Sequence, residues 1–173
     1  MKYEFVPEGF EAPFEVETED FIVRKLTVDE VEKDYKAVMS SKESLRQIFR
    51  ENDDWPKDDM TIDDNYEDLL RHQHEFDDNE AFAYTIVNSD DSECIGCIYI
   101  YPFPYDVYDS KVFYWLVDKV DNDLNESLKS FLDKWIPDSF GLIKPAYPGR
   151  DMTHSEWDKL EANIKEYSSN SNT

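Results

Sequence analysis

Two cysteines, Cys94 and Cys97, form a Cys-Ile-Gly-Cys motif, a spacing found in redox-active thiol pairs and in half of many zinc sites. The motif lies within an apolar run, Cys94 to Tyr101, that predicts a buried strand. Positions three apart on a strand point to opposite faces of the sheet, so we expect that the two thiols neither pair nor chelate together. We therefore predict core thiols, no metal site and an intracellular protein.

Histidines offer a second candidate for metal chemistry in the stretch His72-Gln-His74-Glu75. On a helix, residues two apart point about 200° away from each other and cannot share one ion. The sequence therefore predicts a solvated helix face here. The chain contains no glycine-rich phosphate loop, serine elbow or paired-carboxylate spacing.

An acidic segment from Glu51 to Asp68 contains Trp55-Pro56 and is the best candidate for function outside the core of the fold. Its carboxylates could hold a cationic amine, with Trp55 as an apolar or cation–π surface. The alternative interpretation is a solvated loop without a ligand.

The formal net charge of −23 limits the classes of partner. Such a surface repels nucleic acid and anionic lipid, so we expect neither as a partner. It attracts cations such as polyamines, amino sugars or basic proteins, although the charge could also serve solubility alone. No run of about 18 apolar residues predicts a membrane span, and the acidic N-terminus does not resemble a signal peptide, so we expect a cytoplasmic protein.

The 173 residues fit one domain with a substantial core. We expect an N-terminal arm over 1–20 that its aromatic rings hold against the body, a main domain over 21–150, and a C-terminal helix with a disordered tail over 151–173, in which the tail begins at Ser168. In chain order, the periodicity first predicts a strand over 21–26 and three helices: one after the capping box Thr27–Glu30, a short one over 44–50, and one capped by Thr61. It then predicts strands over 81–87, 94–101 and 112–117, with a loop over 102–110. The last predicted elements are a helix from Asn125 to Pro137, a strand over 140–147, and a helix opened by Thr153 and Glu156.

Several of these segments resemble the GNAT superfamily of N-acetyltransferases over about residues 21 to 148. The opening Phe21-Ile-Val-Arg-Lys-Leu-Thr, with Asp29 and Tyr35 after it, is similar to the family's first strand and helix. The expected hairpin, with its Cys94-Ile-Gly-Cys-Ile-Tyr-Ile strand, resembles the central hairpin of the family, and Tyr147-Pro-Gly-Arg150 resembles the ending of a bacterial subgroup. The resemblance implies an α/β fold with a mixed, mostly antiparallel central sheet flanked by helices.

The resemblance also implies acetyl-CoA as cofactor, lying where the strands 112–117 and 140–147 splay apart. The residues that match the family's cofactor contacts are Leu116, Val117, Asn122, Asp123, Leu124 and Asn125. In the family, the pyrophosphate binds free amides in a glycine-rich loop at a helix N-terminus. The corresponding stretch, Asp118 to Glu126, has no glycine and carries four acids against one lysine, so it resembles a degenerate form of this loop.

The implied chemistry is transfer of an acetyl group to a small, possibly cationic amine. Tyr147 would return a proton to the leaving thiolate, and the base would be Glu80, Glu93 or a held water. Trp55, Tyr114 and Trp115 are the candidate substrate-binding residues. Two alternatives stay open: a GNAT fold without catalysis that serves as a binding module, and an acidic interaction protein whose carboxylates imitate phosphates.

Overall fold

The computed structural model describes residues 3–171, and its centre is a six-stranded sheet in the order β1-β2-β3-β4-β5-β6. The first four junctions are antiparallel and only β5 and β6 are parallel, which confirms the expected mixed, mostly antiparallel sheet. The strands are β1 Glu15–Glu17, β2 Phe21–Lys25, β3 Phe82–Asn88, β4 Cys94–Tyr105, β5 Tyr108–Leu116 and β6 Pro145–Ala146.

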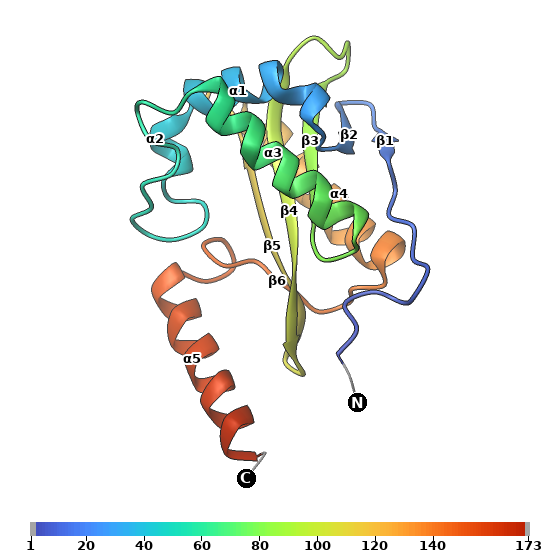
Figure 1. The fold of residues 1–173 in the computed structure, drawn as a ribbon, viewed down its shortest axis with the longest axis vertical. Coiled ribbons are helices and arrows are strands. Elements are labelled where there is room, and N and C mark those ends of the chain that lie inside the picture. The colour runs from blue at the N-terminus through green and yellow to red at the C-terminus, as the bar shows by residue number, and fades with distance from the viewer. Residues whose placement is uncertain (1–2, 172–173) are drawn as a thin grey trace.

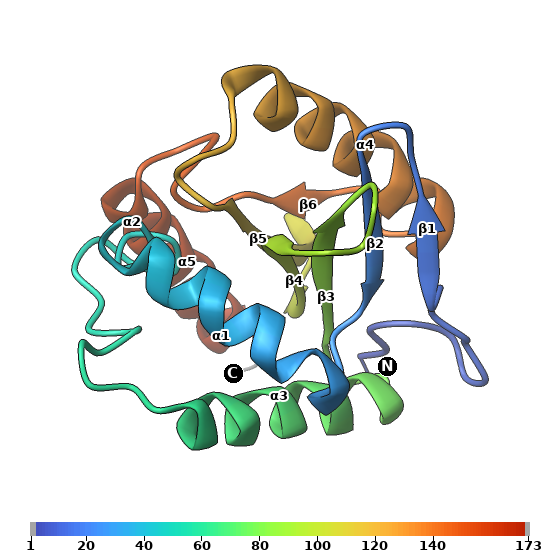
Figure 2. The same ribbon diagram turned by 90° about the horizontal axis from the view of Figure 1, so that it is seen from above.

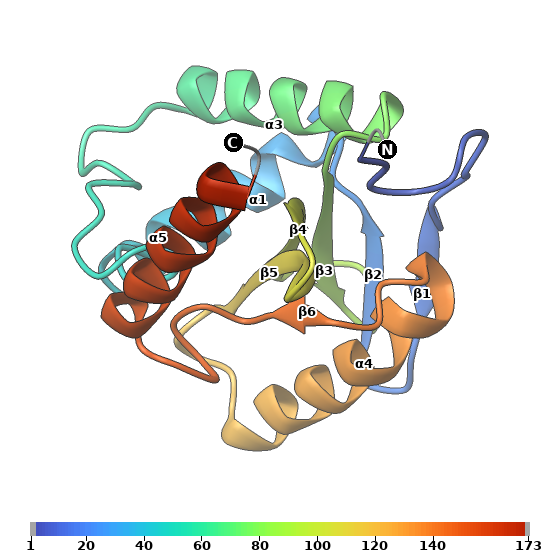
Figure 3. The same ribbon diagram turned by 90° about the horizontal axis from the view of Figure 1, so that it is seen from below.

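Helices cover both faces of this sheet (Figures 1 and 2). The helices are α1 Val31–Ser40, preceded by a 3-10 turn at Val28–Glu30, then α2 Lys42–Leu45, α3 Ile62–Asp77, α4 Asn122–Phe140 and α5 His154–Ser171. Helices α1 and α3 lie on one face and α4 lies on the other, and the view from below shows α5 beside the β5 edge (Figure 3). Among residues 3–171, no helix is long and apolar enough to cross a membrane.

The β4–β5 hairpin is longer than expected. The predicted loop over 102–110 is wrong, because both strands continue to a tight turn between Tyr105 and Tyr108. Proline disrupts a ladder because it has no N–H, and the pairing register shifts between Pro102 and Tyr105 to accommodate it. The hairpin tip provides Phe103 and Tyr108, which pack with Trp157 of α5.

Helix α4 differs from the prediction at both ends. Its N-cap is Asp121 rather than Asn125, and the Asp121 carboxylate accepts the Leu124 N–H at 3.0 Å. The helix also passes through Pro137 and ends only at Gly141, whose φ of 69° is favourable for glycine at a helix C-terminus. The predicted strand over 140–147 therefore shrinks to the two residues of β6, since Gly141 is still the helix end.

The chain termini partly follow the expectation. Phe5 and Phe10 of the N-terminal arm pack against Phe82, as expected for an arm held by its rings, and residues 15–17 add the short strand β1. The disordered tail predicted from Ser168 is wrong as far as Ser171, because α5 continues to that residue. Residues 172–173 lie outside the described part of the chain.

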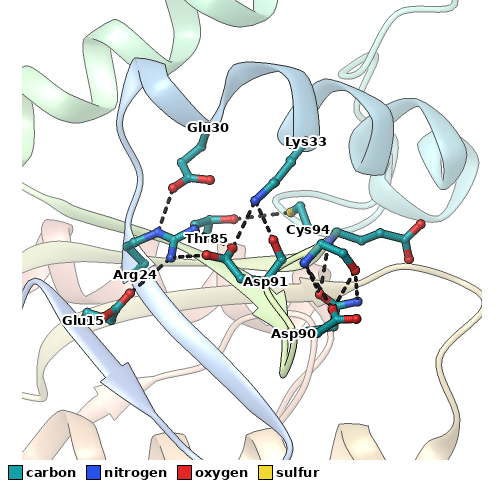
Figure 4. Close-up of polar contacts among 11 residues, drawn as sticks. Glu15, Arg24, Glu30, Lys33, Thr85, Asp90, Asp91 and Cys94 are labelled. Atoms are coloured by element: carbon teal, nitrogen blue, oxygen red, sulfur yellow. Dashed lines mark hydrogen bonds and ion pairs between the residues drawn. The ribbon is translucent and has the colours of Figure 1, made fainter.

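A cluster of charges fixes α1 over the top of the sheet (Figure 4). Arg24 of β2 donates to Glu15, Glu30 and Asp91 at 3.1, 2.7 and 2.9 Å. Lys33 of α1 bonds the same Asp91 at 3.0 Å, so the β3–β4 turn and α1 share one carboxylate. Hydrogen bonds from Arg24 and then Lys33 lower the pKa of Asp91 to about 2. This cluster determines where the next residue of α1, Asp34, meets the sheet.

Candidate functional site

A β-bulge at the start of β4 decides which side chains face α1. Ile86 pairs with Gly96 while Val87 pairs with Cys94, so Ile95 is an extra residue without a cross-strand partner. The extra residue cancels the alternation, and the ligand atoms of Cys94, Cys97 and Asp34 lie within 4.8 Å of one another. The expectation that the two thiols face opposite sides of the sheet is therefore wrong, and the bulge is the reason.

A cavity on the α1–α3 face of the sheet has a volume of about 460 Å³. This volume falls within the usual range for small-molecule sites. Its wall is shared by the sheet, two helices and the connection from α2 to α3. The lining residues are Leu26, Asp34, Phe49, Arg50, Asp53, Trp55, Asn65, Asp68, Leu69, Arg71, His72, Tyr99, Tyr101, Lys111 and Phe113.

Asp34 is a buried carboxylate in the wall of this cavity. Its Oδ2 accepts a hydrogen bond from Asn65 at 2.9 Å, and its Oδ1 accepts one from the Cys97 thiol at 3.3 Å. Burial raises the pKa of Asp34 to about 6, against the opposing effect of these two donors. The sequence contained a signal for this residue, because Asp34 falls on the same helical stripe as the apolar Val31 and Val38.

The other charges at the cavity divide into paired cations and an unpaired carboxylate. Arg71 bonds Glu75 at 3.0 Å, and Arg50 and Lys111 each lie 3.8 Å from the carboxylates of Asp53 and Glu161. Asp68, which is half-buried, forms no ion pair with any described residue. Burial raises its pKa, and the charge of Arg71 and a hydrogen bond with Trp55 oppose this rise. The lining carries three carboxylates and three cations, and Asp68 is the carboxylate among them that a cationic ligand can pair with.

Aromatic rings form the apolar part of the wall. Phe49 packs against Trp55, Tyr99 and Phe113 with ring centroids 5.6, 5.1 and 5.2 Å apart. Trp55 thus lies at the cavity, where the sequence placed a substrate-binding residue. Trp115 does not line it, because this side chain is buried in the core and donates its indole N–H to the Tyr99 hydroxyl at 3.1 Å.

His72 is a buried part of the cavity wall, so the predicted solvated face is wrong for this residue, although His74 is exposed. Its ring lies 5.4 Å from that of Tyr99. Burial, and then the charge of Arg71, lower the pKa of His72 to about 3. The imidazole is therefore neutral across the physiological pH range. The sequence contained a signal for its burial, because His72 falls on the same helical stripe as the apolar Leu69 and Phe76, whereas His74 does not.

On the opposite face, strands β5 and β6 diverge as the resemblance implied. They pair only through Ser110 with Pro145 and Lys111 with Ala146. Beyond this point the Tyr114 carbonyl accepts a hydrogen bond from Arg150 at 2.6 Å, and the guanidinium lies 3.7 Å from the centre of the Tyr114 ring. Tyr147 packs edge-on against the same ring, with centroids 6.1 Å apart.

These contacts close the gap between the strands. The space bounded by Tyr114, Tyr147 and α4 measures about 10 Å³, which is room for about one water molecule. Tyr147 has a buried hydroxyl without a hydrogen-bond partner among the described residues, and burial raises its pKa above the usual range. Such a phenol holds its proton, as an acid requires, but the space beside it is too small for a substrate.

The start of α4 is likewise unsuited to binding the pyrophosphate of the cofactor. The Asp121 carboxylate already occupies the Leu124 amide, and Asp118 accepts a hydrogen bond from Ser44 at 2.7 Å. Of the predicted cofactor residues, Asn122, Asp123, Leu124 and Asn125 form the first turn of α4, while Leu116 and Val117 lie where β5 ends. A phosphate there would meet carboxylates where the cofactor needs free amides. The residues of this chain therefore do not fit acyl-CoA in the arrangement described.

Comparisons with known proteins show a likeness of fold to solved structures. No protein-family model and no curated protein matches the chain. Among solved structures, the apo ribosomal L7/L12 alpha-N-protein acetyltransferase RimL superposes with a TM-score of 0.54 at 16% identity, over 77% of this chain and 70% of that one.

Two further structures extend this likeness. The ribosomal-protein-S5-alanine acetyltransferase of Vibrio fischeri has a TM-score of 0.56 at 17% identity, covering 73% of this chain and 68% of its own. The microcin C7 self-immunity acetyltransferase MccE, solved with acetyl-CoA and AMP, has a TM-score of 0.53 at 11% identity, covering 71% and 66%. At these identities the likeness concerns the architecture, and this chain has the fold of the GNAT acetyltransferases.

Proposed function

We propose that this chain is a GNAT-fold binding protein that takes a small cationic amine into the cavity between α1, α3 and the sheet. The observation that carries the proposal is the contrast between the two faces: the cavity on one face measures about 460 Å³, and the gap on the other about 10 Å³. The first space has room for a small molecule, whereas the second is too small for an acyl-CoA arm, and Arg150 occupies the Tyr114 carbonyl beside it.

The chemistry of the cavity favours an amine with an apolar or aromatic portion. Asp68 provides a carboxylate without an ion-pair partner, and each cation of the wall already has a carboxylate beside it. Phe49 and Trp55 offer ring faces for cation–π contact and for the apolar part of the ligand. The formal net charge of −23 raises the local concentration of such cations.

A second candidate is the transferase itself, moving an acetyl group from acetyl-CoA to the same amine. It is favoured by the GNAT fold and by the two-residue pairing of β5 with β6, which leaves the strands divergent. In this candidate Arg150 would have to leave the Tyr114 carbonyl before the cofactor binds.

Thermal unfolding with ligands separates the two candidates. Phenethylamine is a suitable probe, with its neutral analogue 2-phenylethanol as the ligand control. An amine at 100 times its Kd adds about 2.7 kcal/mol, which raises the Tm of a chain of this size by about 5 to 10 °C. We expect this rise for the amine, little or none for the alcohol, and no rise with millimolar acetyl-CoA.

Two variants assign the effect to the cavity. Asp68→Asn should abolish the shift with the amine, whereas Glu67→Gln, an equal charge change at the exposed neighbouring position, should preserve it. A Tm rise with acetyl-CoA in the unmodified chain, or formation of an acetylated amine, would overturn the binding proposal in favour of the transferase. A shift that is unchanged in Asp68→Asn would remove the cavity as the amine site.

A further inference from the structure

We propose that Asp34, Cys94 and Cys97 form a binding site for one thiophilic divalent cation, with Zn²⁺ as the best-fitting ion. The three side chains are buried, and one ligand atom from each lies within 4.8 Å of the other two. This inference goes beyond the proposed amine binding, because the two thiols lie outside the lining of the cavity and Asp34 alone is shared with it.

The backbone favours a bridging ion over a disulfide. Cys94 and Cys97 lie opposite Val87 and Thr85, which are two residues apart on β3, so the bulge leaves the cysteine Cα atoms about 7 Å apart at the usual rise per residue. A disulfide has Cα atoms about 4.4 to 6.8 Å apart, most often near 5.5 to 6 Å, so this separation lies at the upper limit for one. A metal ion between the two sulfur atoms can instead join them, because both thiols lie on the same face of the strand.

The distances within the cluster fit a tetrahedral zinc ion. Zn–S bonds of about 2.3 Å and Zn–O bonds of about 2.0 Å place two sulfurs about 3.8 Å apart, and a sulfur and an oxygen about 3.5 Å apart. The Cys97 sulfur and Asp34 Oδ1 are already 3.3 Å apart. Two thiolates with one carboxylate suit zinc, whereas Mg²⁺ and Ca²⁺ prefer oxygen ligands alone.

Neighbouring groups orient the three ligands as outer hydrogen-bond partners do in known metal sites. Asn65 donates to Asp34 Oδ2 at 2.9 Å, which directs Oδ1 toward Cys97. The Thr85 hydroxyl donates to the Cys94 sulfur at 3.4 Å (Figure 4), a bond that supports a thiolate. Asp34 also borders the cavity, so an ion can reach the cluster from solvent, and water can fill the fourth position.

Binding exchanges protons for the ion in a balanced step. Each thiol loses its proton as its sulfur forms a bond to the metal, so two protons are released, and no oxidation takes place. The cluster then carries three negative charges against the two positive charges of the ion.

Cobalt titration of the full chain tests the site directly. The protein is stripped with a chelator at neutral pH, and Co²⁺ is added as a spectroscopic substitute for zinc. We expect one equivalent to bind with thiolate-to-cobalt charge-transfer absorption and tetrahedral visible bands, and Zn²⁺ to displace it. We also expect Zn²⁺ at 100 times its Kd to raise the Tm by about 5 to 10 °C, which distinguishes the folded site from thiols of unfolded chains.

Variants assign the ligands. Cys97→Ser should abolish the charge-transfer band, and Asp34→Asn, which keeps the shape and the Asn65 contact, should weaken binding at least about tenfold. His74→Gln, at an exposed histidine of α3, should bind as the unmodified chain does. Circular dichroism establishes whether each variant is folded. If Cys97→Ser does not fold, Asp34→Asn still tests the site. Four results would each overturn the proposal: binding of less than a tenth of an equivalent, an unchanged charge-transfer band in a folded Cys97→Ser chain, an unchanged affinity in a folded Asp34→Asn chain, or loss of binding in His74→Gln. A Tm lowered by zinc would overturn it as well.

Discussion

The buried histidine of the cavity wall makes the stability of this protein depend on pH. His72 has a pKa of about 3 in the folded chain and 6.5 as its ordinary value, because burial disfavours the imidazolium. The unfolded chain therefore binds a proton below about pH 6.5 while the folded chain does not. Stability is consequently lost as pH falls from 6.5 toward 3, and above pH 7.5 this residue contributes almost nothing.

The size of the effect at pH 5.0 follows from the two pKa values. The unfolded state gains about 2 kcal/mol relative to the folded state, from 1.36 kcal/mol for each unit by which the pH lies below 6.5. The result depends little on the folded value, since any folded pKa below about 4 gives almost the same loss at pH 5.0. The magnitude thus tests the burial of His72 rather than the detail of its surroundings.

Urea unfolding at pH 7.5 and pH 5.0 measures this contribution as a difference between variants. His72→Gln cannot be protonated, so the unmodified chain should lose about 2 kcal/mol more than His72→Gln between the two pH values. Titration of the many carboxylates affects both proteins alike and cancels. The exposed His74→Gln should show the full loss of the unmodified chain. Equal losses in the unmodified chain and His72→Gln would refute the reasoning.

Three further outcomes are expected from the backbone and packing. Gly96→Ala should lower the free energy of unfolding in urea by about 3 kcal/mol or more, because its Cβ would lie 2.1 Å from the Trp115 carbonyl oxygen. Gly141→Ala, with φ of 69° and open space around it, should lower it by only about 1 to 2 kcal/mol. Similar losses in the two variants would contradict this. Asp121→Ala should destabilise the chain by about 1 kcal/mol through loss of the α4 cap, and an unchanged urea midpoint would exclude the cap. Trp157→Ala should remove hydrogen-exchange protection from α5 while β3 and β4 stay protected, because Trp157 joins α5 to Phe103 and Ala146; retained protection in α5 would show that other contacts hold the helix.

The sequence predicted the architecture well where local signals were strong. The apolar runs around Tyr84, Ile98 and Trp115 predicted three central strands, and Thr61 was predicted as the N-cap that it forms at the start of α3. The prediction failed where a single residue was given more weight than the longer helical pattern around it. Pro137 suggested a helix end, but a proline removes only one helical hydrogen bond, and three further residues continue α4 to Phe140 before Gly141 caps it.

The candidate site was less predictable, because its residues meet only through tertiary structure. Trp55 lines the cavity and Tyr147 follows β6 beside the narrow gap, while their roles in binding and in catalysis stay predictions. The bulge at Ile95 was invisible in the sequence, since only the pairing with β3 creates it, and it reversed the expected orientation of Cys94. Arg150 belonged to a noted motif, but no spacing rule connects it to the carbonyl of Tyr114.

The way in which the gap beside β5 is closed determines how firmly acyl-CoA is excluded. A longer β6 would occupy the β5 main chain with a ladder of hydrogen bonds, which no single substitution could remove. Here β6 pairs through only two residues, and one side chain, Arg150, takes the Tyr114 carbonyl. Arg150→Ala therefore frees that carbonyl without touching the sheet. If the acids at the start of α4 also prevent cofactor binding, as the Asp121 cap indicates, Arg150→Ala will still not bind acetyl-CoA. If Arg150 is the sole obstacle, acetyl-CoA will raise the Tm of Arg150→Ala and leave that of the unmodified chain unchanged.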